Sequence, residues 1–298
     1  MLNNYKPEAA GPIVEAIRRN DRATALRLLD EQVEKAEGRE KAFWLATRAN
    51  MRKQIGTPEQ HSAAEADWQE AYRLDKDNPL FVLMLIHDAV ASQRLDQLRN
   101  LPKSTRTRIR TELFDDWRFW NNVGFLHRFL RRWYPSYRAN TKALKLYLAL
   151  SPEQRKYDEG WILPLRCWHA RAALRVGRIG EAIADVGQAE EIFRERPYIS
   201  PMHLALAKAD LAISQGDYPA AQEALYTGTA VLAQTPEQAR PSPLVRLECL
   251  ILAARISRAE GRVAGLRNFC EQALAIAVEA ERPYTEREIR LIMDGADF

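Results

Sequence analysis

The sequence predicts an all-α fold built from repeated pairs of antiparallel helices. Apolar residues recur at helical spacing through most segments, as at Ile13 and Ile17 and at Ala25, Leu28 and Leu29. No stretch alternates between apolar and polar residues as a half-buried strand does. A short glycine-containing motif recurs in the C-terminal half at spacings of 39 and 45 residues. Repeats of about this length are typical of stacked helix pairs, so we expect one helix hairpin per repeat.

Composition excludes several classes of protein. The 298 residues are 46% hydrophobic and 28% charged, which is enough apolar material to bury a sizeable core. The net charge of +4 is too weak a bias to argue for nucleic acid or an anionic membrane as a partner. The chain has no N-terminal apolar segment and no run of about 18 apolar residues, so we expect neither export nor membrane spanning and predict a cytoplasmic location.

The cysteines predict neither disulfides nor a metal site. Cys167, Cys249 and Cys270 are odd in number, widely spaced and without a C-x-x-C pair, so we expect buried thiols in a reducing compartment. Cys167 and His169 would form half of a zinc site, but the sequence offers no second pair of ligands. We therefore expect no metal and no cofactor.

Helix starts are marked by a repeated capping pattern. A hydroxyl residue precedes a proline and is followed three positions later by glutamine in three segments, 57–60, 151–154 and 235–238. The hydroxyl oxygen accepts from a free backbone N–H, proline is tolerated at the first helical position, and glutamine can bond back to the cap. We predict a helix start at each proline, and another cap at Thr285, which precedes Glu288 by three residues.

The recurring glycine motif defines three repeats in detail. Gly177, Gly216 and Gly261 each precede a charged residue and an apolar residue. Glycine permits the tight backbone turn between two antiparallel helices, because it has no Cβ. An alanine stands seven residues before each glycine, and small or apolar residues stand five, nine and twelve residues after it. These residues are Ala170, Ala182, Val186 and Ala189; Ala209, Ala221, Leu225 and Gly228; and Ala254, Leu266, Cys270 and Ala273.

This pattern resembles the tetratricopeptide repeat (TPR) family. The resemblance covers residues 152–281 well and residues 40–100 through Trp68, Ala71 and the turn that ends at Pro79. It departs from the family where a large residue is replaced by His169, Lys208 and Ala253, and where the period exceeds 34 residues. The longer period is similar to the TPR arrays of bacterial maltose-activator-type regulators and peptide-pheromone receptors.

The resemblance implies a right-handed α-solenoid of antiparallel TPR-like helix pairs, in which the first helix of each pair lines an inner groove. We expect three regions: N-terminal repeats in 1–101, a basic, aromatic-rich helical bridge in 102–150, and C-terminal repeats with a capping helix in 151–298. The implied groove residues are Arg171, Arg175, His203, Asp210, Ser214, Glu248, Arg255 and Arg258. This polar surface of mixed charge suits a protein or peptide segment better than an apolar metabolite.

The bridge is the most unusual segment of the sequence. Residues 103–145 contain eleven basic and three acidic side chains, a net charge of +8, so the rest of the chain carries −4. Trp117, Trp120, Gly124, His127 and Leu130 share one helical stripe. One interpretation buries this stripe and leaves the arginines as a solvated face.

The other interpretation of the bridge is a face that binds an acidic protein. Nucleic acid is disfavoured as a partner, because no recognised nucleic-acid-binding motif accompanies the charge. The candidate residues are Arg118, Trp120, Asn121, Asn122, Arg128, Arg131, Arg132 and Trp133.

The sequence contains no catalytic motif. A phosphate-binding glycine loop, a G-x-S-x-G elbow, an H-E-x-x-H motif and the kinase signatures are all absent, so we do not expect an enzyme. The leading hypothesis is a non-enzymatic protein- or peptide-interaction module, a scaffold or adaptor. The alternative is a ligand-responsive sensor of the peptide-pheromone-receptor or maltose-activator type that lacks its own DNA-binding domain.

Overall fold

The structure is a computed structural model that describes residues 7–295, except 20, 56–57, 77, 92, 100–106, 108, 110, 196–200 and 235–242. Every regular element in these residues is a helix, which confirms the predicted all-α class. The chain divides into two compact units. The first comprises Met1–Ala89, Gln97–Leu113 and Pro236–Ser242, and the second comprises Val90–Asp96, Phe114–Thr235 and Pro243–Phe298. The predicted division at residues 101 and 150 remains a prediction.

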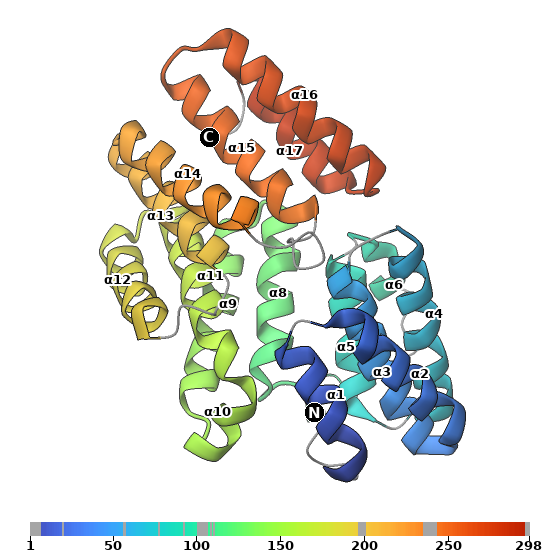
Figure 1. Ribbon diagram of the computed structural model, residues 1–298. Coiled ribbons are helices and arrows are strands. Elements are labelled where there is room, and N and C mark those ends of the chain that lie inside the picture. Colours follow the sequence, from blue (N-terminus) through green and yellow to red (C-terminus); the bar gives the residue numbers. More distant parts are fainter. Residues whose placement is uncertain are drawn as a thin grey trace. The chain divides into compact units, whose positions relative to one another are not determined.

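The first unit is a succession of packed helices (Figure 1). Its helices are α1 (Pro7–Arg18), α2 (Arg22–Lys35), α3 (Gly38–Ile55) and α4 (Pro58–Leu74), together with most of α5 (Pro79–Ala91) and of the short α6 (Leu95–Arg99). Helix α1 packs against α2, α2 against α3, and α3 against α4. Trp44 and Leu29 are completely buried in its core, together with Trp68 and Ala71, two residues on which the TPR resemblance rests.

The second unit consists of four helix pairs and a closing helix. The pairs are α8 (Trp117–Phe129) with α9 (Trp133–Leu148), α11 (Ile162–Leu174) with α12 (Ile179–Glu195), α13 (Pro201–Gln215) with α14 (Tyr218–Gln234), and α15 (Pro243–Ala259) with α16 (Val263–Glu279). Helix α10 (Pro152–Asp158) and the 3₁₀ turn η2 (Glu159–Trp161) connect the first two pairs, and α17 (Pro283–Asp294) ends the unit. The first helices α11, α13 and α15 contact one another in sequence, and α15 contacts α17. This is the arrangement of a TPR-like α-solenoid of helix pairs.

The three glycine turns adopt the predicted conformation. Gly177, Gly216 and Gly261 have φ angles of +76°, +75° and +71°, in the left-handed region that favours glycine. The alanines seven residues before them are buried, with exposed fractions of 0%, 0% and 1%. A Cβ atom on Gly228 would lie 2.7 Å from the Cβ of Ala205, so the two helices of that pair approach too closely for a larger residue. The small residues of the repeat therefore permit close helix packing.

The predicted helix caps have three different outcomes. At Ser151 the capping box is confirmed: its Oγ accepts from the N–H of Gln154 at 3.3 Å, and its N–H donates to the side chain of Gln154 at 3.0 Å. Thr57 and the cap at 235–238 lie outside the described residues. The cap at Thr285 is wrong, because α17 begins two residues earlier at Pro283 and Thr285 is buried inside the first helical turn.

The bridge helices pack like the other pairs. Helices α8 and α9 have 13 and 16 residues, no longer than the 17-residue helices of the repeats. The buried face of α8 includes Trp117 and Gly124, as predicted, together with Phe119, Asn121 and Asn122. Trp120, His127 and Leu130 are only half-buried. The apolar stripe is therefore rotated relative to the prediction. Arg110, one of the basic residues of the bridge, lies outside the described residues.

The cysteines lie in the core, as predicted. All three cysteines are free and buried, and burial raises the pKa of Cys167 to about 12, so this thiol is unreactive at neutral pH. In the described part of the chain no helix is both long and apolar enough to cross a bilayer.

Candidate functional site: the arginine recess of the second unit

A recess lies where the inner helices of the second unit meet. Helices α8, α9, α11, α13, α15 and α17 all contribute to its walls, and its empty volume is about 500 Å³ including the solvent at its mouth. Its charged lining residues are Arg128, Arg171, Arg175, Asp210, Arg255 and Glu288. Its aromatic walls are Phe125, Trp133 and Trp168. We call this feature the arginine recess.

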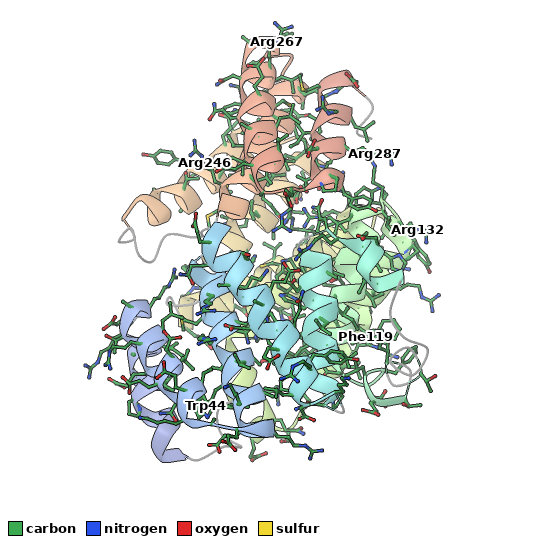
Figure 2. The ribbon with its side chains drawn as sticks, turned by 90° about the vertical axis from the view of Figure 1, so that its right-hand side faces the viewer. Trp44, Phe119, Arg132, Arg246, Arg267 and Arg287 are labelled. Atoms are coloured by element: carbon green, nitrogen blue, oxygen red, sulfur yellow. The ribbon has the colours of Figure 1, made fainter. Side chains whose placement is uncertain are left out.

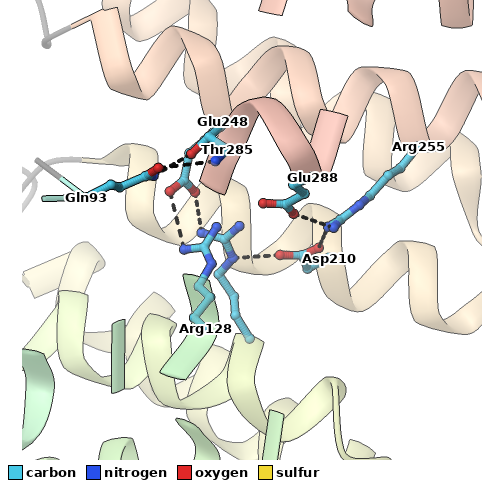
Figure 3. A network of polar contacts seen from close by, with 8 residues as sticks. Gln93, Arg128, Asp210, Glu248, Arg255, Thr285 and Glu288 are labelled. Carbon is cyan, nitrogen blue, oxygen red and sulfur yellow. Dashed lines mark hydrogen bonds and ion pairs between the residues drawn. The ribbon is translucent and has the colours of Figure 1, made fainter. Parts of the chain in front are cut away.

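Ion pairs connect the arginines across four helices (Figure 3). Arg171 on α11 occupies the centre, because its Nε lies 2.6 Å from Asp210 on α13 and its Nη1 lies 2.6 Å from Glu248 on α15. Arg128 on α8 contacts the other oxygen of Glu248 at 3.3 Å. Glu248 therefore joins the first helix pair of the unit to the repeats that follow.

The network continues to the closing helix. Arg255 on α15 lies 3.8 Å from Asp210 and 2.7 Å from Glu288 on α17. Asp210 thus receives two guanidinium groups, from Arg171 and Arg255, as α13 lies between α11 and α15. Figure 3 shows this chain of alternating charges running from Arg128 to Glu288.

The pKa shifts follow from this compensation. Burial alone would raise the pKa of Glu248, but Arg128 and Arg171 outweigh burial and hold it well below its usual range. Burial likewise opposes the ionised form of Asp210, and the surrounding arginines lower its pKa. Burial would lower the pKa of Arg171, yet Glu248 and Asp210 raise it. Glu248, Asp210 and Arg171 are therefore charged at neutral pH.

The described charged residues of the recess and its ion pairs have both signs. They are the arginines Arg128, Arg171, Arg175 and Arg255 and the carboxylates Asp210, Glu248 and Glu288. His203 lies beside Glu248 and Arg171, but burial lowers its pKa to about 4, so the imidazole is neutral at pH 7.

Trp133 forms one wall of the recess and organises two further cations. The guanidinium of Arg175 lies 5.1 Å from the centre of its ring and that of Arg131 lies 5.7 Å from it. Because arginine stacks on indole without losing its planar donors, the aromatic surface positions the Arg175 charge at the recess.

Close packing of α8 on α9 forms the floor of the recess. A Cβ atom on Gly124 would lie 2.7 Å from the side-chain amide nitrogen of Asn140, so a larger residue there would force Asn140 to move. Ser136 donates to the carbonyl oxygen of Gly124 at 2.8 Å, and Asn140 donates to the carbonyl oxygen of Ser136 at 2.9 Å. The first bond joins α9 to α8, the helix that carries Arg128, and the second lies within α9.

The structure brings together most of the groove residues implied by the resemblance. Arg171, Asp210, Glu248 and Arg255 form the ion-pair network, and Arg175 lines the same recess. The remaining three residues, His203, Ser214 and Arg258, make other contacts. His203 packs edge-on against Trp168 at 5.1 Å, Ser214 is exposed and donates to the carbonyl oxygen of Leu211, and Arg258 donates to the carbonyl oxygen of Ile292.

The bridge residues divide between three environments. Arg128, Arg131 and Trp133 belong to the recess or its rim. Asn121 and Asn122 are buried, with exposed fractions of 4% and 2%, so neither amide projects toward a ligand from the surface. The rest lie elsewhere: Arg118 pairs with Asp116, Trp120 donates to the carbonyl oxygen of Phe114, and Arg132 is exposed at the surface (Figure 2).

Gln93 is a residue that the sequence did not reveal. Its side-chain oxygen accepts from the N–H groups of Tyr284 and Thr285 at 2.9 and 3.2 Å, and its side-chain nitrogen donates to the hydroxyl of Thr285 at 2.6 Å. It therefore supplies the N-terminal cap that α17 lacks, since Arg282 makes no side-chain cap bond. No local pattern could have indicated a contact between residues 192 positions apart.

Thr141, His169 and Asp185 form a line of polar contacts. Thr141 Oγ1 lies 2.9 Å from His169 Nε2, and His169 Nδ1 lies 2.5 Å from Asp185. The hydroxyl of Thr141 also donates to the carbonyl oxygen of Tyr137 at 2.9 Å. His169 and Asp185 are buried, so these contacts join α9, α11 and α12 inside the second unit. Among the described residues, no group of three or more His, Cys, Asp or Glu could hold a metal ion.

Comparison with solved structures finds a protein that aligns over nearly the full length of both chains. A tetratricopeptide repeat protein from Parabacteroides merdae resembles this chain. It is 14% identical, with 96% of each chain covered and a TM-score of 0.49. No protein-family model matches the sequence, and no curated protein matches it. The assignment to TPR-like helix pairs therefore depends on the packed pairs, the glycine turns and the buried small residues described above.

Proposed function

We propose that this chain is a non-enzymatic protein-interaction module that binds a segment of a partner protein at the arginine recess. The observation that carries the proposal is the charge of the recess, where four arginines from three inner helices meet three carboxylates between aromatic walls. Guanidinium groups beside aromatic rings suit a partner side chain that carries a carboxylate. The acidic residues already present show that these guanidinium groups bind carboxylates in this geometry.

Arg175 is the residue best suited to receive a partner carboxylate. It lies at the C-terminal cap of α11, is half-buried and stacks on Trp133. Arg171 lies deeper in the network, where two ion pairs hold it to Asp210 and Glu248. A partner side chain would therefore approach Arg175 and contact the indole of Trp133 with its apolar part.

A peptide array tests this proposal. Twelve-residue peptides with zero, one or several acidic residues are probed with the full chain, and the peptides that bind are titrated against Arg175→Gln and Arg267→Gln. The second variant is a matched control, because Arg267 is an exposed residue of α16 outside the recess (Figure 2). We expect acidic peptides to bind. Arg175→Gln should lower their affinity at least tenfold, and Arg267→Gln should change it less than twofold. Binding that is equal in both variants would refute the recess as the site.

A further inference from the structure

A second groove lies between α8 and α9, away from the residues of the arginine recess. Its walls include Trp120, Tyr134, Arg138, Lys142 and Lys145, and its empty volume is about 1220 Å³ including open solvent. None of these residues lines the recess. We call this feature the α8–α9 groove.

The cations of this groove have no carboxylates facing them from its walls. Among the described residues that line it, none is Asp or Glu. Tyr137 is the one lining residue that bonds an acid, since its hydroxyl donates to Glu181 at 2.7 Å, and Glu181 also accepts from Arg178. His127 adds no charge at pH 7, because burial and the nearby Arg132 lower its pKa. The described walls of the groove therefore hold three cations, Arg138, Lys142 and Lys145, and no carboxylate.

Aromatic rings lie directly beside these charges. The Nζ atom of Lys142 lies 4.2 Å from the centre of the Trp120 ring and 5.1 Å from that of Phe114. The Nε1 group of Trp120 donates to the carbonyl oxygen of Phe114 at 2.7 Å, which fixes the indole plane. Tyr134 is 56% exposed and offers an apolar ring at the other end of the groove. A ligand can thus contact charge and aromatic surface together.

The spacing of the cations fits an extended peptide. Arg138, Lys142 and Lys145 share one stripe of α9, separated along the axis by about 6 Å and about 4.5 Å at 1.5 Å per residue. In an extended chain, side chains on one face repeat every two residues, or about 6.6 Å. Acidic residues at alternate positions would therefore meet successive cations.

We infer that the α8–α9 groove is a docking site for an extended acidic segment of a partner protein, with acidic side chains at alternate positions. The inference goes beyond the proposed function, since it concerns a different surface. Charge and aromatic surface alone would also suit nucleic acid. The acidic segment is favoured because three cations neutralise too few phosphates for strong binding, and no nucleic-acid-binding motif accompanies them.

Fluorescence anisotropy with the full chain tests the inference. The probe is a labelled twelve-residue peptide with glutamate at alternate positions, serine between them and one central leucine. Its control has glutamine in place of every glutamate. We expect the glutamate peptide to bind in a salt-sensitive manner and the glutamine peptide to bind at least tenfold more weakly. Equal binding of the two peptides would overturn the inference.

Paired variants locate the binding on the molecule. Arg138→Glu with Lys145→Glu reverses two exposed charges of the groove, and Arg267→Glu with Arg287→Glu makes the same charge change on α16 and α17 (Figure 2). The groove pair should lower the affinity for the glutamate peptide at least tenfold, and the control pair should lower it less than twofold. The circular dichroism spectrum should be unchanged in both. Loss of binding in both pairs, or in neither, would contradict the inference. Arg175→Gln should leave this peptide bound, which separates this site from the recess.

Lysine footprinting provides a test on the unaltered chain. Acetylation of Lys142 and Lys145 should fall at least threefold when the glutamate peptide is bound. Lys208, which pairs with Glu190 on another helix, should not change. Unprotected groove lysines would contradict docking there. A 20-nucleotide single strand could also displace the peptide. Displacement at strand concentrations below the dissociation constant of the peptide would assign the groove to nucleic acid instead.

Discussion

Basic side chains on the two faces of the α8–α9 pair have opposite environments. On the recess face, Arg128 is bound to Glu248, which also receives Arg171, and compensation extends through Arg255 to α17. On the groove face, Arg138 and Lys145 are exposed, and none of the described residues that line the walls is acidic. Net charge alone therefore does not indicate the role of a basic segment. The same +8 stretch supplies both an internal bond between helices and an open surface.

The largest expected effect is the loss of the central arginine. Arg171→Ala leaves Asp210 without one of its two guanidinium partners and Glu248 with Arg128 alone. Removing one member of a buried ion pair costs about 3–5 kcal/mol, because a desolvated charge remains. Denaturant unfolding monitored by circular dichroism should show a loss of this size, whereas Arg267→Ala should change the free energy of unfolding by less than about 0.5 kcal/mol. An effect of Arg171→Ala below 1 kcal/mol would mean that the network does not hold the helices together.

The next largest expected effect on stability is the loss of the N-terminal cap of α17. Gln93→Ala removes one side-chain acceptor from two backbone N–H groups and the partner of the Thr285 hydroxyl. Leaving such buried groups unpaired costs about 1–3 kcal/mol. Gln188→Ala, an exposed position on α12, is the matched control. Hydrogen exchange should also accelerate in α17, and unchanged protection of Tyr284 and Thr285 would contradict the capping role.

The pH dependence of stability tests the environment of His203. Its folded pKa of about 4 lies below the value of 6.5 expected in the unfolded chain, because burial disfavours the imidazolium. The unfolded state therefore binds the proton first as pH falls, and stability present above pH 6.5 is lost toward pH 4. Between pH 7 and pH 5 the loss from this group amounts to about 2 kcal/mol at most. Urea titrations at the two pH values should show a smaller loss of unfolding free energy in His203→Phe than in the wild type. An equal loss in this variant would contradict the assignment.

The groove charges should contribute least to stability. Arg138→Glu with Lys145→Glu alters two exposed side chains whose charges are not compensated by the groove walls. We expect a change in the free energy of unfolding within about 0.5 kcal/mol. A destabilisation above 1.5 kcal/mol in the same denaturation experiment would show that these residues belong to the folded core, and the contrast between the two faces would fail.

The sequence predicted the repeat architecture well, because that architecture depends on local requirements. The glycine turns need φ near +75°, and the buried alanines need small side chains, so Gly177, Gly216 and Ala209 mark the repeat by themselves. The capping box at Ser151 is local in the same sense.

The candidate site could be predicted only in part. The resemblance implied Arg171, Asp210, Glu248 and Arg255 as neighbours, but not which charge meets which, since pairing depends on helix positions. The cap from Gln93 and the burial of Asn121 involve tertiary contacts that leave no pattern in the sequence.

A single titration series tests the central claim that the recess binds a partner segment. An acidic peptide selected by the full chain is titrated by calorimetry into the wild type, Arg175→Gln and the groove pair Arg138→Glu with Lys145→Glu. The account predicts that at least one selected peptide loses tenfold or more in affinity with Arg175→Gln and less than twofold with the groove pair. If every selected peptide depends on the groove pair and none on Arg175, the recess is a structural network and not the binding site.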